Sequence, residues 1–142
     1  MSDSMDSWIG KTVIREVAIS TELIDAFTEL SGDRSPVHCN AEFARAIGFR
    51  DRIAHGALLI ALTSALVGNE LPGRRGVLQS LKLDFRKPNY PGDRVIISME
   101  VVETHSSTGV LVMNVRMTNQ RNELVCTGTI QVGLVTRDVA EG

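Results

Sequence analysis

The stretch GALLIALTSALVG, residues 56–68, decides the fold because it is apolar on nearly every side. The tripeptide LPG at 71–73 follows it as a stop signal, so we expect a helix from Gly56 to about Asn69. This run is too short to span a membrane and contains a threonine and a serine. In a water-soluble domain, a helix that is apolar all round must be enclosed by other elements.

Downstream of this helix the hydrophobic period changes from 3.6 to 2, which predicts strands. Four runs have one apolar face each: Leu81, Leu83 and Phe85; Val95, Ile97, Met99 and Val101; Leu111, Met113, Val115 and Met117; and Leu124, Cys126, Ile130, Val132 and Leu134. The separators NYPGD (89–93), HSSTG (105–109) and NQRN (119–122) are short and rich in turn residues, as in an antiparallel meander. We therefore predict an α+β fold, a single hot-dog domain whose antiparallel sheet wraps around the long central helix.

Upstream, the chain reads as one strand followed by two amphipathic helices. Residues 11–19 are rich in β-branched side chains and predict the first strand. Residues 20–32 space their apolar side chains like a helix, which a serine or threonine can cap and Gly32 can end. Residues 40–49 repeat this pattern, with Asn40 as the cap. The side chains that we expect on buried faces are Leu23, Ile24, Phe27 and Leu30 in the first helix and Phe43, Ala46 and Ile47 in the second.

The bulk properties indicate one cytoplasmic domain. A chain of 142 residues has the usual size of a single domain, so we take 1–142 as one unit with flexible tails at 1–9 and 136–142. The formal net charge of −2 argues against a general nucleic-acid binder, which needs a basic face. Cys39 and Cys126 lack paired spacing, and the polar, acidic start does not resemble a signal peptide. We expect no nucleic-acid partner and no membrane partner.

The loop SGDRSPVH, residues 31–38, carries an aspartate, a proline and a histidine between the two predicted helices. Asp33 suits a polar turn, and His38 suits packing or capping at a helix start. Alternatively, the two side chains form an acid–base pair that acts on one water molecule. A nucleophilic pair of Cys39 with His38 is disfavoured because adjacent residues on an extended loop point apart.

The segment FTELSGDRSPVHCNAEFARAIGFRDRIAHGALLIALTSALVG, residues 27–68, resembles the MaoC-like, (R)-specific enoyl-CoA hydratases and dehydratases. The family's hydratase motif reads roughly G-D-x-N-P-[ILV]-H, followed by an Asp- or Asn-led helix and by an HG pair that opens the central helix. The resemblance continues through LPGRRGVLQSLKLDFRKPNYPGD and covers roughly residues 20–104. One position departs from the motif, because Ser35 stands where the family usually has Asn. A hydrogen bond that the Asn side-chain amide makes there must come from the shorter serine hydroxyl or is lost.

Carried over residue by residue, the resemblance implies a catalytic dyad of Asp33 and His38. It also implies that the backbone N–H of Gly56 contacts the substrate thioester carbonyl. Ser64 matches a hydroxyl that steadies the aspartate in some members, and Ser35 is a supporting position. Two of these positions have simpler, purely structural interpretations. Gly56 can be only the residue at which the helix begins, and the Ser64 hydroxyl can donate a hydrogen bond to the preceding helical turn.

The function implied by the resemblance is that of a hydro-lyase in fatty acid metabolism. Such an enzyme hydrates trans-2-enoyl-CoA, or dehydrates a 3-hydroxyacyl thioester on CoA or acyl carrier protein, and we expect it to need no cofactor and no metal. The phosphates of CoA would meet basic side chains at the surface, and the candidates are Arg50, Arg52, Arg74, Arg75, Arg86 and Lys87. A homodimer or dimer of dimers is expected, because an isolated sheet leaves an open edge strand.

Two other functions remain as alternatives. One is a hot-dog acyl-thioester hydrolase, a family that usually places its carboxylate on or near the central helix. Residues 56–69 contain no acid and no histidine, which counts against this alternative. The other is a non-catalytic partner subunit that binds acyl thioesters, and only Ser35 in place of Asn encourages it.

Overall fold

The computed structural model describes residues 4–135, with helices mainly in the first half and strands in the second. In chain order the elements are the 3₁₀ helix η1 (Met5–Trp8), strand β1 (Thr12–Ala18), helices α1 (Thr21–Ser31), α2 (Pro36–Cys39), α3 (Ala41–Ala46) and α4 (Gly56–Asn69), and strands β2 (Gly76–Phe85), β3 (Arg94–His105), β4 (Val110–Thr118) and β5 (Leu124–Leu134). The predicted C-terminal tail, 136–142, and residues 1–3 lie outside the described residues.

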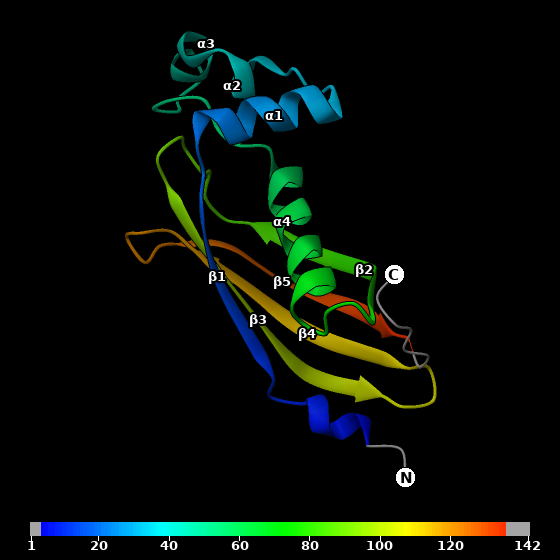
Figure 1. The fold of residues 1–142 in the computed structure, drawn as a ribbon. Helices are drawn as coiled ribbons and strands as arrows, with labels where there is room; N and C mark the ends of the chain where they lie inside the picture. The colour runs from blue at the N-terminus through cyan, green and yellow to red at the C-terminus, as the bar shows by residue number, and fades with distance from the viewer. Residues whose placement is uncertain (1–3, 136–142) are drawn as a thin grey trace.

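The five strands form one antiparallel sheet in the order β1-β3-β4-β5-β2. Figure 1 shows that this sheet is strongly curved. The predicted meander is confirmed for β3, β4 and β5, which the segments HSSTG and NQRN join as hairpins. The hairpin expected at NYPGD is wrong, because this segment joins β2 at one edge to β3 near the other edge. Turn residues specify a change of direction, but they do not specify which strand comes next in the sheet.

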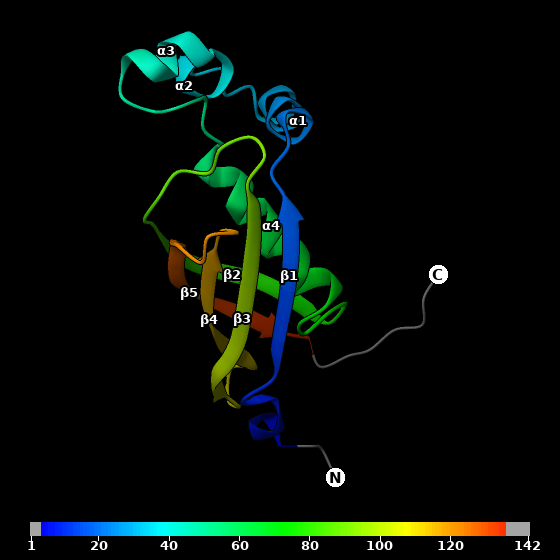
Figure 2. The ribbon, with the colours of Figure 1, turned by 90° about the vertical axis from the view of Figure 1, so that its left-hand side faces the viewer.

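The core lies between α4 and one face of the sheet (Figures 1 and 2). The helix begins and ends at the predicted residues, and its buried side chains are Leu58, Leu59, Thr63, Leu66 and Val67. From the sheet, the apolar faces predicted for β3 and β4 are buried, among them Ile97, Met99, Leu111 and Met113. The predicted α+β hot-dog arrangement is therefore confirmed.

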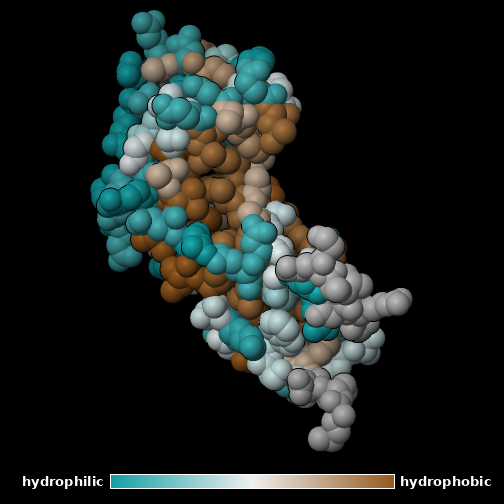
Figure 3. Space-filling model, in the orientation of Figure 1, coloured by the Kyte–Doolittle hydropathy of each residue, from teal (hydrophilic) through white to brown (hydrophobic). Residues whose placement is uncertain are grey.

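Among residues 4–135, no element covers the opposite side of α4. Its exposed residues are Ala57, Ala61, Ser64, Ala65 and Gly68, which recur at helical spacing. Figure 3 shows the apolar surface that remains around this helix, in the middle of the view. The expectation that the helix is enclosed on all sides is thus wrong for one chain, because the sheet covers only one side. Among residues 4–135, no helix is both long and apolar enough to cross a membrane.

Helices α1, α2 and α3 gather beyond one end of the sheet, next to the start of α4 (Figures 1 and 2). We call these three helices the cap. The predicted helix signals are confirmed, since the Ser20 hydroxyl accepts the Leu23 N–H at 3.0 Å and Asn40 Oδ1 accepts the Phe43 N–H at 3.1 Å. Gly32 ends α1 in the left-handed conformation, with a φ of 75°.

The buried face predicted for α3 is wrong. Phe43 and Ile47 are 41% and 53% exposed, Ala46 is exposed too, and the buried residue of this helix is Ala44. Leu30, at the end of α1, is likewise exposed. The cap extends beyond the sheet, so no other element of the described part of the chain covers these side chains.

The two cysteines are unpaired. Cys39 is exposed on α2, and Cys126 is buried on β5. Burial raises the pKa of the Cys126 thiol to about 11, so this thiol stays protonated at neutral pH. Cys126 is therefore a core residue without reactivity.

The packing of the core makes a testable prediction at Ile97, which is 0% exposed on β3. The substitution Ile97→Ala removes buried methyl groups and leaves a cavity, so we expect the free energy of unfolding to fall by about 2–5 kcal/mol. The matched control is Ile14→Ala on the neighbouring strand β1, where the side chain is 66% exposed and the loss should not exceed about 1 kcal/mol. Urea denaturation measures both values, and equal losses would contradict this description of the core.

Candidate active site

The loop between α1 and α2 holds Asp33 in a defined conformation. The N–H of Asp33 donates to the Ser31 hydroxyl at 3.1 Å, and Asp33 Oδ1 accepts the N–H of Ser35 at 3.1 Å. Pro36 then begins α2, where its fixed φ suits the first helical position. Asp33 therefore does form a polar turn, but this turn uses only one of its two carboxylate oxygens.

His38 lies on α2 and turns its free ring nitrogen towards Asp33. Its Nδ1–H donates to the carbonyl oxygen of Ile53 at 2.7 Å, which leaves Nε2 as the nitrogen available for chemistry. Nε2 lies 3.9 Å from Asp33 Oδ2, and the two side chains are 13% and 50% exposed. This separation is too long for a direct hydrogen bond, but a water molecule can donate one hydrogen to each atom. The structure thus brings the two predicted residues together.

His55 belongs to the same cluster. Its ring stacks on that of His38 with 3.9 Å between centroids. The side chain is buried, and its Nε2–H donates to the carbonyl oxygen of Asp33 at 3.1 Å. The hydroxyl of Thr28 lies 3.4 Å from the same nitrogen. His55 therefore supports both members of the pair, through the backbone of one and the ring of the other.

Gly56 begins α4 directly after His55, and it lines a cavity that His38 also lines. The first N–H groups of a helix have no intrahelical acceptor and carry the positive end of its dipole, and the side chain of His55 makes no cap bond to them. A Cβ at position 56 would lie 3.1 Å from the ring of Phe85. Glycine is therefore the residue that allows this close approach at the helix start.

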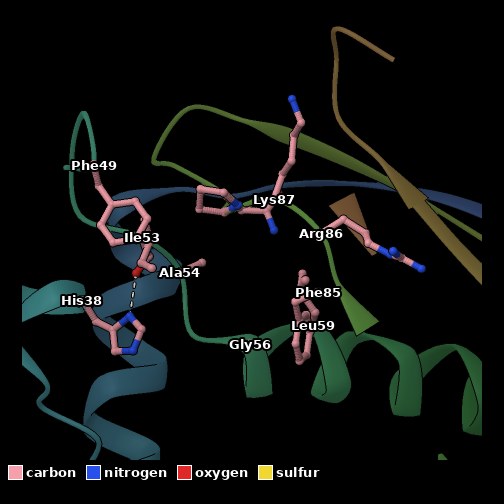
Figure 4. A pocket seen from close by; sticks show the side chains of 11 residues that line it. His38, Phe49, Ile53, Ala54, Gly56, Leu59, Phe85, Arg86 and Lys87 are labelled. Atoms are coloured by element: carbon pink, nitrogen blue, oxygen red, sulfur yellow. Dashed lines mark hydrogen bonds between the residues drawn. The ribbon is translucent and has the colours of Figure 1, made fainter. Parts of the chain in front are cut away.

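Of the groups described so far, His38 and Gly56 line a cavity of about 320 Å³. Figure 4 shows His38 to the left of Gly56, with Phe49 above His38 and Phe85 beside Leu59. Its lining residues are His38, Phe49, Ile53, Ala54, Gly56, Leu59, Phe85, Arg86, Lys87, Pro88 and Asn89. Most of this wall is apolar, and the polar groups converge at a few points, as in small-molecule sites.

Of the six basic side chains predicted to meet phosphates, Arg86 and Lys87 line the cavity. In Figure 4 the charged ends of both point away from His38. Lys87 pairs with Glu123 at 2.6 Å, and hydrogen bonds from Lys87, Asn119 and Arg121 lower the pKa of that carboxylate to about 2. Arg86 has a long contact of 3.5 Å with the hydroxyl of Thr127.

The two predicted supporting serines differ in their position relative to Asp33. Ser35 precedes α2 without a side-chain cap bond, and its N–H holds the carboxylate of Asp33. Ser64 lies on the exposed side of α4, and residues 4–135 contain no hydrogen bond between Ser64 and Asp33. The steadying role of Ser64 stays a prediction.

The side chains of Asp33, His38 and His55 place one possible metal-ligand atom each within 4.8 Å of one another. Two of the four ring nitrogens are already hydrogen-bonded to main-chain carbonyl oxygens, those of Ile53 and Asp33. His55 Nδ1 is buried and has no partner among the described residues. The free atoms that face each other are therefore Asp33 Oδ2 and His38 Nε2, an arrangement that suits proton transfer.

A family model described as a MaoC like domain matches residues 6–123. The 3-hydroxybutyryl-CoA dehydratase of Methylorubrum extorquens is 41% identical over 98 residues, which cover 69% of this chain and 62% of that protein. The chain thus spans less than two thirds of this relative. The (R)-specific enoyl-CoA hydratase of Aeromonas caviae is 33% identical over 78% of this chain and 83% of its own length.

Solved structures show the same likeness. The unliganded R-hydratase of Pseudomonas aeruginosa has a TM-score of 0.84 at 31% identity, covering 94% of this chain and 88% of its own. The (R)-hydratase of A. caviae involved in PHA biosynthesis has a TM-score of 0.84 at 30% identity, covering 89% of this chain and 96% of its own.

The ion pair at the cavity mouth makes a testable prediction about acid stability. The folded-state pKa of Glu123 is lowered from 4.5 to about 2, so its stabilising effect is present above pH 4.5 and is lost as the pH falls towards 2. The Tm of the unmodified protein should exceed that of Glu123→Gln at neutral pH, and this difference should close over the same interval.

Thermal melts across this pH range measure the difference in Tm. The control is Glu100→Gln at an exposed position of β3, which should show no such closing difference. A gap between the unmodified protein and Glu123→Gln that stays constant down to pH 2 would contradict the assignment.

Proposed function

Because this chain belongs to the MaoC-like family, we propose that it is a hydro-lyase that acts on enoyl thioesters. It adds water across the C2–C3 double bond of a trans-2-enoyl-CoA to give the (R)-3-hydroxyacyl-CoA, or removes water in the reverse direction. The observation that carries this proposal is the pairing of Asp33 Oδ2 with His38 Nε2 beside a cavity that also receives the start of α4. The relatives' names support the same reaction type and do not favour the hydrolase or the binding-subunit alternative.

In this mechanism one water molecule is held between Asp33 and His38. Either group takes a proton from the water as its oxygen attacks C3, and the electrons of the double bond move onto the thioester oxygen. The proton that completes the reaction is then delivered to C2 by the dyad, so the enzyme returns to its starting state. The hydrogen bond to Ile53 keeps His38 Nε2 directed towards this water.

The developing charge on the thioester oxygen needs a donor that is already in place. The N–H of Gly56 at the start of α4 supplies it, together with the favourable end of the helix dipole. A single preorganised donor of this kind is worth roughly 3–4 kcal/mol of transition-state stabilisation. The acyl chain lies in the apolar part of the cavity, and Arg86 and Lys87 at its mouth are placed to meet the phosphates of CoA.

We also propose that two copies of the chain associate, and that the protein is cytoplasmic. Strand β2 is an open edge of the sheet, with Val77 and Phe85 exposed on it. The small exposed residues of α4 leave an apolar surface that a second copy can cover closely (Figure 3). The unpaired cysteines suit the reducing cytoplasm.

The catalytic proposal is tested with crotonyl-CoA, by following the loss of the enoyl-thioester absorbance. The unmodified protein should hydrate this substrate, and Asp33→Asn should lose about two orders of magnitude or more in kcat, since general acid–base catalysis contributes that much. Both proteins should melt at similar temperatures, because the Asp33 side chain is half exposed. Activity should survive treatment with EDTA.

Other outcomes are equally informative. Release of free CoA without hydration would replace the hydro-lyase by a thioester hydrolase. An Asp33→Asn variant that keeps full activity would remove Asp33 from the mechanism. Inactivity of the unmodified protein on crotonyl-CoA and on longer enoyl thioesters, with CoA or acyl carrier protein, would favour a binding subunit.

Association is tested by light scattering coupled to size-exclusion chromatography. We expect twice the mass of one chain, or a multiple of it, for the unmodified protein. The substitution Ala61→Arg places a charge on the exposed side of α4 and should shift the protein towards the monomer. Leu30→Arg, at an exposed position of the cap, is the control and should leave the mass unchanged. A monomer at every concentration would contradict the proposal.

A further inference from the structure

Arg52 is one of the basic side chains predicted to meet phosphates, but it is not part of the lining of the cavity. Only 14% of its side chain is exposed. Its Nη1 donates to Asp25 Oδ1 at 2.8 Å and to the main-chain carbonyl oxygen of His38 at 3.3 Å. The guanidinium therefore binds α1 and α2, and it contacts the backbone of one member of the acid–base pair.

Helix α2 depends on such outside contacts because it has only four residues, Pro36–Cys39. The last carbonyl oxygens of a helix have no donor within the helix. In α2, two consecutive residues of the segment before α4 supply these donors. The N–H of Ile53 donates to the carbonyl oxygen of Val37 at 3.0 Å, and Arg52 donates to that of His38. The segment 52–53 therefore fixes the main chain of α2.

The same two residues hold His38 at both ends of its side chain. The carbonyl oxygen of Ile53 accepts the ring Nδ1–H at 2.7 Å, and the Arg52 guanidinium binds the main chain from which the ring projects. With both ends fixed, Nε2 points in one direction, towards Asp33 Oδ2 at 3.9 Å. Without the guanidinium, the main chain of α2 can shift, and the distance from Nε2 to the carboxylate changes with it.

Asp25 connects the same guanidinium to α1, and the end of α1 leads into the loop that carries Asp33. The Asp25 side chain is 58% exposed, so water competes for its carboxylate, whereas Arg52 is mostly covered. Both bonds start from one nitrogen atom, Nη1, so the two helices are joined at a single point. Arg52 thus links the helices that precede and follow the Asp33 loop.

We propose that Arg52 is a positioning residue that acts through His38. By joining α1 to α2, it sets the separation of Asp33 and His38 across which the water molecule is held. This inference rests on the proposed function, because the pair that it positions is the acid–base pair of that reaction. It replaces the expected phosphate contact of Arg52, since the guanidinium is already paired with Asp25 and mostly covered.

The kinetic test compares crotonyl-CoA with crotonyl-pantetheine, which has the same arm without the phosphates. Arg52→Met keeps an apolar stem and removes the guanidinium. A displaced acid–base pair should lower kcat by about tenfold or more with KM nearly unchanged, and kcat/KM should fall by the same factor on both thioesters. A rise of KM for crotonyl-CoA alone would show a phosphate contact and would overturn the inference.

The matched control is Arg34→Met. Arg34 also belongs to the cap region and pairs with Glu29 at 2.8 Å, but residues 4–135 contain no hydrogen bond between Arg34 and His38. Its kcat should stay within about twofold of the unmodified value, because loss of an exposed ion pair has a small effect by itself. All rates are divided by the folded fraction from thermal melts, so a loss of stability does not pass for a loss of catalysis.

A double-mutant cycle tests the route through Asp25. Asp25→Ala removes the other partner of Arg52 at an exposed helical position, where alanine is well tolerated. It should lower kcat by about threefold, and Asp25→Ala/Arg52→Met should be no slower than Arg52→Met alone, because Asp25 acts only through Arg52. Losses that multiply in the double variant would contradict this link between the helices.

Crystal structures of the unmodified protein and of Arg52→Met measure the position of the pair without any substrate. The separation of Asp33 Oδ2 and His38 Nε2 should change by about 1 Å in the variant, a displacement large enough to explain the loss in kcat. An unchanged separation, or an unchanged kcat, would overturn the role of Arg52. Inactivity of the unmodified protein on both thioesters would count against the proposed function, and the two structures would still decide the role of Arg52.

Arg52→Met can also fail to fold, since it leaves two acceptors without their donor. Asp25→Ala then replaces it in both measurements, because this exposed position tolerates the change. A loss of about threefold in kcat at unchanged KM, together with a shifted pair in the crystal structure, would support the inference. An unchanged kcat in Asp25→Ala would overturn it.

Discussion

The hydrogen bond from His38 Nδ1 to the carbonyl oxygen of Ile53 connects the two segments that carry the site. One segment is α2 with the loop before it, at the cap, and the other leads into α4, which belongs to the core. The bond fixes which ring nitrogen of His38 is free and holds the ring above His55. His55 in turn bonds to the backbone of Asp33, so the carboxylate, the imidazole and the start of the helix are positioned by one short chain of contacts.

A second constraint is that two walls of the cavity run side by side. Residues 54–56 form one wall and residues 85–89 the other, and the bond between Ala54 and Asn89 links them. One wall therefore presents the N–H of Gly56, while the other presents an aromatic ring and two basic side chains. The two walls of the cavity thus carry different chemical groups.

The sequence predicted those features that depend on local pattern. The bounds of α4 and the apolar faces of β3 and β4 follow from the hydrophobic period of the sequence. The helix-capping roles of Ser20, Gly32 and Asn40 follow from the chemistry of their side chains and backbone. Features that depend on tertiary arrangement were missed: the crossover at NYPGD, and the exposure of the apolar side of α3. For the site, the motif predicted that Asp33 and His38 meet. Nothing local indicated that His55 would stack on His38, since this contact depends on segments that are distant in the sequence.

The cap has few buried residues of its own, and helix α2 has none. Local opening of a protein costs least free energy where buried apolar contact is sparse, so α2 and α3 should open at a lower free-energy cost than the sheet. His38 thus lies on a helix that has no buried residue of its own. A substrate that touches both His38 on the cap and Leu59 on the core binds only the closed form, and its binding free energy therefore adds to the stability of the closed cap.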